Sequence, residues 1–168
     1  MSQDFYSSLK LGDMGEKIFE EWMRSHVNVT DVSKLHHVND FINKDYEYDY
    51  QVDTIDKSYA FEVKCLAGAD GRGARYNNAV IEVWQDTKKT KRPGWFKATK
   101  AGKLDYVIFY NRFDSCLYAF KAPLLLKWTE HQQYLTYARN GNRDNPGWIV
   151  MLRWEEYGAG YLGKKQWR

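Results

Sequence analysis

Hydrophobic positions in the first part of the chain recur with the 3.6-residue period of a helix. The stripe consists of Leu11, Met14, Ile18, Phe19, Trp22 and Met23. This spacing predicts an amphipathic helix over about residues 4–25. Gly12 and Gly15 weaken its first half, because glycine is a poor helix former.

Beyond this helix the pattern changes to the short apolar and alternating runs of strands. Tyr46–Asp53 and Tyr59–Leu66 are close enough in sequence to form an antiparallel hairpin. Further strands are predicted at Ala79–Gln85, Leu104–Tyr110, Cys116–Phe120 and Trp148–Trp154. Pro123 is suited to the first turn of a helix that runs to about Arg139. The pattern predicts an α/β fold, with one early and one late helix on a mixed or antiparallel sheet.

Length and composition narrow the class of protein. The chain has 168 residues, of which 43% are hydrophobic and 28% charged, so we expect a single soluble domain over 1–168. No apolar run is long enough to span a bilayer, and the first residues do not form a leader. Cys65 and Cys116 fit no metal-binding spacing and are interpreted as reduced thiols. We therefore expect a cytoplasmic protein with no membrane partner.

Charge is unevenly distributed along the chain. Residues 86–103 contain seven basic residues and one acid, whereas residues 40–56 contain six acids and one lysine. Basic side chains next to Trp95 and Phe96 are typical of nucleic-acid contacts, and the alternative, which we prefer for these two aromatic residues, is that they anchor the segment to the core. The candidate phosphate contacts are Lys88, Lys89, Lys91, Arg92, Lys97, Arg72 and Arg75. The alternative is two solvated surfaces of opposite charge.

The candidate chemistry lies on the predicted hairpin. Glu62 and Lys64 share one face of the second strand, and Asp49 and Asp53 share one face of the first. Carboxylates on neighbouring strands repel one another unless a cation joins them, and oxygen ligands suit Mg²⁺ or Mn²⁺. Another acid–x–Lys tripeptide, Asp86–Lys88, lacks this context.

The hairpin register decides which aspartate faces Glu62. A two-residue turn at Lys57–Ser58 places Asp53 opposite Glu62, whereas a four-residue loop from Thr54 to Lys57 places Asp49 there. Tight hairpins favour residues that tolerate positive φ, and Lys-Ser offers none. We therefore prefer Asp49 as the metal ligand, with Asp53 as the substitute.

Asp49, followed after twelve residues by Glu62-Val63-Lys64 and preceded by a helix with Gly15-Glu16, resembles the PD-(D/E)xK nuclease superfamily. The superfamily includes restriction enzymes and phage-type junction resolvases. The resemblance covers roughly residues 10–85, and Tyr48 stands where the motif has proline. It implies a restriction-endonuclease-like core, with a central mixed sheet, and a bacterial or phage source.

The same resemblance implies the roles of the site residues. Asp49 and Glu62 match the metal-binding acids, Lys64 matches the catalytic lysine, and Glu16 matches a helix glutamate that completes the site. The implied activity is a Mg²⁺-dependent endodeoxyribonuclease, in which Mn²⁺ can substitute and no organic cofactor takes part. Cutting both strands of DNA with one small domain usually needs two sites, so a homodimer is expected.

Two alternatives remain open on the sequence alone. The first is a nucleic-acid-binding module that uses the basic segment 86–103 without cleaving. The second is a protein-interaction factor in which the acidic and basic segments contact partners. The choice of DNA site, junction, nick or single strand, and of DNA or RNA, is not encoded in the motif.

Overall fold

The structure is a computed structural model of the chain. It describes residues 3–35, 48–66, 78–84, 95–112, 114–131, 135–138, 146–153 and 161–166. Among these residues, no helix has the length and apolar character that crossing a membrane requires. Both cysteines, Cys65 and Cys116, are free thiols.

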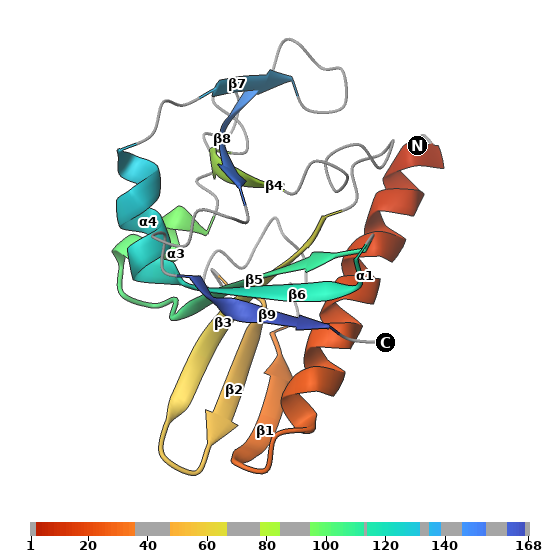
Figure 1. The fold of residues 1–168 in the computed structure, drawn as a ribbon, viewed down its shortest axis with the longest axis vertical. Helices are drawn as coiled ribbons and strands as arrows, with labels where there is room; N and C mark the ends of the chain where they lie inside the picture. The colour runs from red at the N-terminus through yellow and green to blue at the C-terminus, as the bar shows by residue number, and fades with distance from the viewer. Residues whose placement is uncertain are drawn as a thin grey trace.

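The centre of the molecule is a six-stranded mixed sheet (Figure 1). Its strands, in spatial order, are β1 (Val29–Lys34), β2 (Tyr50–Thr54), β3 (Ser58–Leu66), β5 (Tyr106–Asn111), β6 (Cys116–Lys121) and β9 (Tyr161–Gln166). Strands β3 and β5 are parallel, and every other neighbouring pair is antiparallel. The fold is therefore α/β with a mixed central sheet, as the sequence predicts.

Helix α1 (Gln3–Arg24) covers one face of this sheet and matches the predicted helix closely. Its stripe buries Phe19 and Met23 against Tyr50, Phe61 and the neighbouring strands. Phe19 is fully buried, and its ring lies 5.1 Å from the rings of both Tyr50 and Phe61. The apolar period therefore determines which side of the helix faces the sheet.

Gly15 has a packing role that the sequence pattern does not reveal. A Cβ atom at Gly15 would lie 2.9 Å from the Cβ of Cys65 on β3, closer than side-chain atoms normally approach. The absence of a side chain lets α1 lie directly against β3 at this position. The neighbouring Gly12 has open space around it, so only Gly15 is required by packing.

The opposite face of the sheet is covered by two short helices, α3 (Phe96–Lys100) and α4 (Ala122–Glu130). Their buried side chains pack with Val107, Phe109 and Phe120 of the sheet. Lys100 and Glu130 join the two helices in an exposed ion pair at 3.0 Å. Pro123 lies in the first turn of α4, as its fixed φ favours.

The predicted late helix is wrong beyond residue 130. Helix α4 ends at Glu130, and Leu135–Ala138 form strand β7 in place of helix. Strand β7 pairs with β8 (Pro146–Arg153), which also pairs with β4 (Asn78–Trp84), giving a second, three-stranded antiparallel sheet. Thr136 and Tyr137 prefer strands, and the pairing with β8 outweighs the apolar helical spacing.

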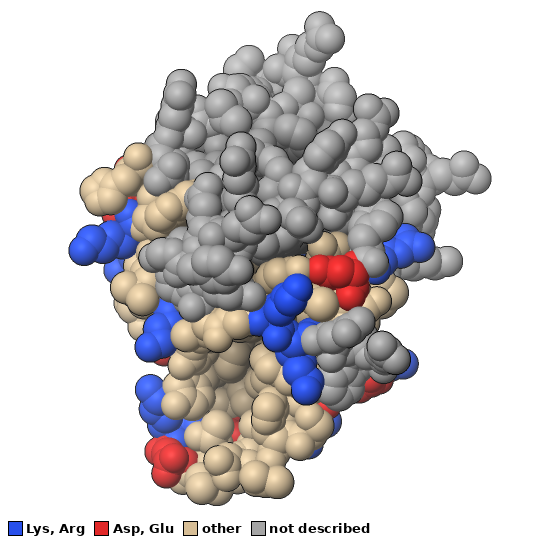
Figure 2. Space-filling model, viewed as in Figure 1, with Lys and Arg blue, Asp and Glu red and all other residues tan. Residues whose placement is uncertain are grey.

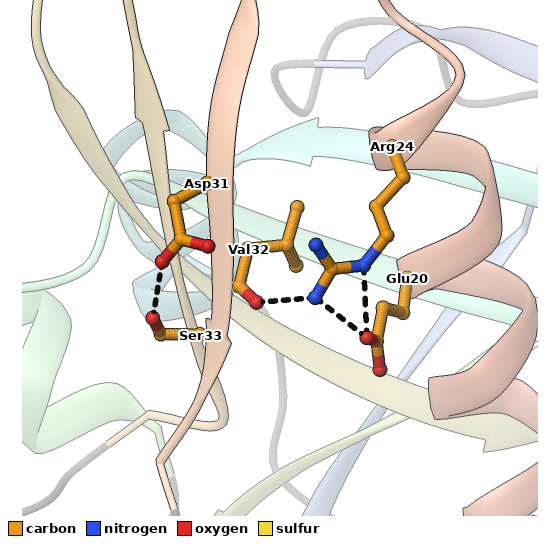
Figure 3. A network of polar contacts seen from close by, with 5 residues as sticks. All are labelled: Glu20, Arg24, Asp31, Val32 and Ser33. Carbon is orange, nitrogen blue, oxygen red and sulfur yellow. Dashed lines mark hydrogen bonds and ion pairs between the residues drawn. The ribbon is translucent and has the colours of Figure 1, made fainter.

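Strand β1 lies at one edge of the central sheet, and α1 contacts that edge (Figure 3). Arg24 donates from Nη2 to the Val32 carbonyl at 2.8 Å, and its Nε and Nη2 both reach Glu20 Oε1. The Leu35 N–H donates to the Asp49 carbonyl and therefore points toward β2. Backbone groups alternate in direction along a strand, so those of Val32, three residues earlier, point away from β2. Arg24 therefore binds the outer edge of the sheet.

Candidate active site

The β2–β3 hairpin has the four-residue loop that the turn chemistry favours. Asp53 is paired with Ser58 and Tyr50 with Phe61, which confirms the longer of the two possible loops. Thr54 closes the loop, since its N–H and its hydroxyl both donate to the Lys57 carbonyl, at 2.9 and 2.8 Å. The Lys57 N–H in turn donates to the Thr54 hydroxyl at 3.2 Å.

At the other end of the hairpin, β2 separates from β3 at Asp49. The regular register ends at the Tyr50–Phe61 pair, and the Asp49 N–H donates at 3.0 Å to the carbonyl of that same Phe61, the residue before Glu62. The Asp49 carboxylate then accepts the Val63 N–H at 2.8 Å through Oδ2. A side chain thus replaces the next backbone bond of the ladder and is held beside β3.

Glu62 and Lys64 lie on the same face of β3, as strand alternation predicts. Lys64 Nζ lies 2.5 Å from Glu62 Oε1. The Glu62 side chain is 8% exposed and that of Lys64 is 33% exposed. This face is the one covered by α3 and α4, because the paired residues of β5, Val107 and Phe109, belong to that core. Asp49, Glu62 and Lys64 are thus brought together at one place.

Glu16 reaches the neighbourhood of Asp49 from the α1 side of the sheet. Its carboxylate forms an ion pair with Lys34 of β1, and Lys34 lies opposite Tyr50. The hydrogen bond from Lys34 to Glu16 raises the pKa of Lys34, and the charges of Asp13 and Asp49 add to this effect. Glu16 and Glu62 therefore lie on opposite faces of the sheet, and each forms an ion pair with its own lysine.

Tyr50 separates these two groups of charges. Its side chain is 1% exposed, and burial is the largest cause of its raised pKa. The carboxylates of Glu16, Glu20 and Asp49 also raise the pKa of this hydroxyl.

Asp53 is placed at the far end of the hairpin. It is four residues from Asp49 along β2, about 13 Å at the usual rise of a strand. Ser58 donates to its carboxylate at 2.5 Å and Gln51 at 3.0 Å, and these bonds lower the pKa of Asp53. The register thus pairs Asp53 with Ser58 and leaves Asp49 at the end of the hairpin near Glu62, while the metal role of either residue stays a prediction.

The donor set at Asp49 and Glu62 fits a hard divalent cation. Both residues offer carboxylate oxygens, and Mg²⁺ is commonly held by one or two carboxylates together with waters and substrate phosphates. Among the residues that the structure describes, no three His, Cys, Asp or Glu side chains form a ready metal cage. Glu16, ion-paired with Lys34, is thus not gathered into one cluster with Asp49 and Glu62.

The predicted phosphate contacts fall almost wholly outside the described residues. These are Arg72, Arg75, Lys88, Lys89, Lys91 and Arg92, while Lys97 lies in α3 but its side chain is not described. On the face drawn in Figure 2, the described Lys and Arg side chains lie at several separate places, with acidic side chains between them. The nucleic-acid contacts therefore stay predictions.

Sequence reasoning missed Lys34 and Tyr50. Strand β1 has one fully buried position, Val32, so its apolar pattern is too weak to predict a strand. The pairing of Lys34 with Tyr50 follows only from the β1–β2 register. The alternation of Tyr50 and Val52 on the buried face is the one signal that marks Tyr50 as part of the core.

Comparison with known proteins adds little to this geometry. No protein-family model and no curated protein sequence matches the chain. The chain is similar to the solved structure of a nuclease from a fusselovirus, with 12% sequence identity and a TM-score of 0.49, over 92% of this chain and 87% of that chain. A similarity at this level carries no argument about function, which must come from the residues themselves.

Proposed function

We propose that the chain is a metal-dependent endonuclease of the PD-(D/E)xK type that hydrolyses phosphodiester bonds in DNA. The observation that carries this proposal is the register of the β2–β3 hairpin. With Tyr50 paired to Phe61, the Asp49 carboxylate accepts the N–H of Val63, which lies between the buried Glu62 and Lys64 in the sequence, and Lys64 Nζ lies 2.5 Å from Glu62 Oε1. Two carboxylates that could hold a divalent ion, with an ammonium beside them where β2 separates from β3, supply the groups that metal-assisted phosphate hydrolysis uses.

In this proposal Asp49 and Glu62 hold Mg²⁺, or Mn²⁺ in its place. The ion would supply Lewis-acid stabilisation of the negative charge that develops on the phosphate. The Val63 N–H fixes Asp49 before the ion arrives, so the ligand is already oriented. Glu62 is buried, so its surroundings have a lower effective dielectric constant than water. The attraction between its carboxylate and a bound cation is therefore stronger there than in water.

Lys64 acts on the substrate in this scheme. One third of its side chain is exposed, so its ammonium can be reached by a phosphate oxygen while it remains near Glu62. It would donate hydrogen bonds to the phosphate or orient the attacking water. Glu16 is proposed to join the site from α1.

The partners follow from the same proposal. The substrate is DNA, bound in part by the basic side chains of the 86–103 segment and by Arg72 and Arg75. Cleavage of both strands needs two active sites, so we propose a homodimer as the active form. Sedimentation of the protein with and without duplex DNA measures this stoichiometry, and a strictly monomeric complex would exclude the dimer.

The test of the proposed function is cleavage of supercoiled plasmid, single strands and synthetic junctions with Mg²⁺ or with chelator. Glu62→Gln and Lys64→Met are each expected to lower the cleavage rate about 100-fold or more. Circular dichroism and thermal unfolding check that both variants fold. Full Mg²⁺-dependent activity in either folded variant would exclude this active site, and cleavage that persists with chelator would exclude the metal.

A second candidate is a nucleic-acid-binding module that does not cleave. The Glu62–Lys64 ion pair favours it in one respect, because a buried glutamate also needs a lysine for structural reasons alone. This candidate predicts salt-sensitive DNA binding without turnover in Mg²⁺ or Mn²⁺. The same cleavage assay, run beside a DNA-binding titration at two salt concentrations, separates the two functions.

A further inference from the structure

The ion pair between Lys34 and Glu16 differs from the other acid–lysine pair of α1. Glu16 Oε2 is buried, and the two side chains are 39% and 21% exposed. The pair of Lys17 with Glu21 has a separation of 4.0 Å and side chains that are 79% and 52% exposed. Less water surrounds the Lys34 pair, so its charges act on each other and on their neighbours more strongly.

Lys34 is also held next to the proposed metal ligand. The residue after it, Leu35, donates its N–H to the Asp49 carbonyl at 2.9 Å, and Lys34 itself lies opposite Tyr50. The charges of Glu16, Asp13 and Asp49 all raise the pKa of Lys34, so the ammonium lies within the field of all three carboxylates. Lys34 is therefore the cation that neutralises this acidic group from the α1 side of the sheet.

We propose that Lys34 competes with the divalent cation for the carboxylates at this fork and thereby sets the metal affinity of the protein. The inference rests on the proposed function and deepens it. The Lys34 ammonium, paired with Glu16, repels an incoming divalent ion and also keeps Glu16 bound to β1. Metal binding must therefore overcome the Lys34 charge, and Glu16 becomes a ligand only when it exchanges Lys34 for the ion. Lys34 is thus a positioning residue for Glu16.

The expected size of the effect follows from Coulomb's law. A unit charge several ångströms from a divalent ion, in the partly exposed setting of this pair, changes the binding constant by about tenfold. Removing the charge of Lys34 should tighten metal binding by that factor. A lysine whose function is only structural would lower thermal stability when replaced and leave metal affinity unchanged.

The experiment is a calorimetric titration of the full chain with Mn²⁺ in the absence of nucleic acid. Lys34→Met is expected to bind Mn²⁺ about tenfold more tightly than the wild type. Lys34→Arg keeps the charge and should stay near the wild-type affinity. Lys100→Met is the matched control, because it removes the same charge from another acid–lysine pair, that with Glu130 between α3 and α4.

Unchanged or weaker Mn²⁺ binding in Lys34→Met would overturn the inference. Lys34→Gln serves as a second neutral variant, and thermal unfolding without metal shows that each variant folds. If the wild type binds Mn²⁺ and cleaves DNA but Lys34→Met keeps its affinity, only this inference fails. If the wild type neither binds Mn²⁺ nor cleaves, the proposed function fails with it.

Discussion

The two ends of the β2–β3 hairpin carry the same kind of residue in different surroundings. At the closed end Asp53 accepts hydrogen bonds from the side chains of Ser58 and Gln51. At the open end the Asp49 carboxylate accepts the N–H of Val63, the residue after the buried Glu62. The period-two pattern of the sequence assigns both aspartates to the same strand face, so this pattern alone does not distinguish them. The neighbours on β3 do.

The difference teaches that an aspartate becomes a candidate ligand where the backbone ladder stops. At the closed end the backbone groups of β2 and β3 are paired with each other, and the Asp53 carboxylate accepts hydrogen bonds from the neutral side chains of Ser58 and Gln51. At the open end the Asp49 carboxylate takes the place of a backbone carbonyl as the acceptor for the Val63 N–H. The buried Glu62 nearby has the Lys64 ammonium as its partner.

The largest expected effect separates the two aspartates directly. Asp49→Asn should lower Mg²⁺-dependent plasmid cleavage about 100-fold or more, because it removes a charged ligand from the proposed site. Asp53→Asn should change the rate by no more than about twofold, as a surface substitution away from the site. Single-turnover rates at saturating Mg²⁺ measure both. A greater loss in Asp53→Asn would reverse the assignment of the two ends.

A second prediction concerns the approach of α1 to the open end. Gly15→Ala places a Cβ 2.9 Å from the Cβ of Cys65, so it should lower the free energy of unfolding by about 1–3 kcal/mol. Gly12→Ala is the control, because no atom lies within 4 Å of its Cβ position. It should raise the free energy of unfolding by about 0.5–1 kcal/mol through helix propensity. Urea titrations measure both, and equal effects would contradict the packing at Gly15.

The smallest effect is expected at the closed end and depends on pH. The Ser58 and Gln51 hydrogen bonds lower the pKa of Asp53 below its ordinary 3.8. Their contribution to stability is therefore present above about pH 4 and is lost as the pH falls through the lowered value. Ser58→Ala should be slightly less stable than the wild type at pH 6, and this deficit should shrink as the pH falls toward 2. Thermal unfolding at the two pH values gives the comparison, and an equal deficit at both would exclude this origin.

Local patterns predicted the parts of the fold that local forces determine. The period of Phe19 and Met23 gives α1, and the lack of a positive-φ residue at Lys57–Ser58 gives the four-residue loop that pairs Asp53 with Ser58. The alternation of Glu62 and Lys64 gives their shared face. Each of these follows from residues close together in sequence, so a pattern can report it.

The missed features depend on contacts between distant segments. The parallel pairing of β3 with β5 joins residues more than forty positions apart, for instance Phe61 and Tyr106. Strand β7 is set by β8, and β1 by β2, against weak or contrary local patterns. Lys34 reaches Glu16 only because of the β1–β2 pairing, so no spacing in the sequence marks it.

Arg24 on the outer margin of β1 has a consequence for assembly. The Val32 carbonyl is one of the groups that an added strand from another chain would need, and a guanidinium anchored by Glu20 already takes it. Such a cation obstructs growth of the sheet by strand addition at that margin. A second copy that docks there must first dislodge this clamp, so association through β1 is disfavoured relative to surfaces without such protection.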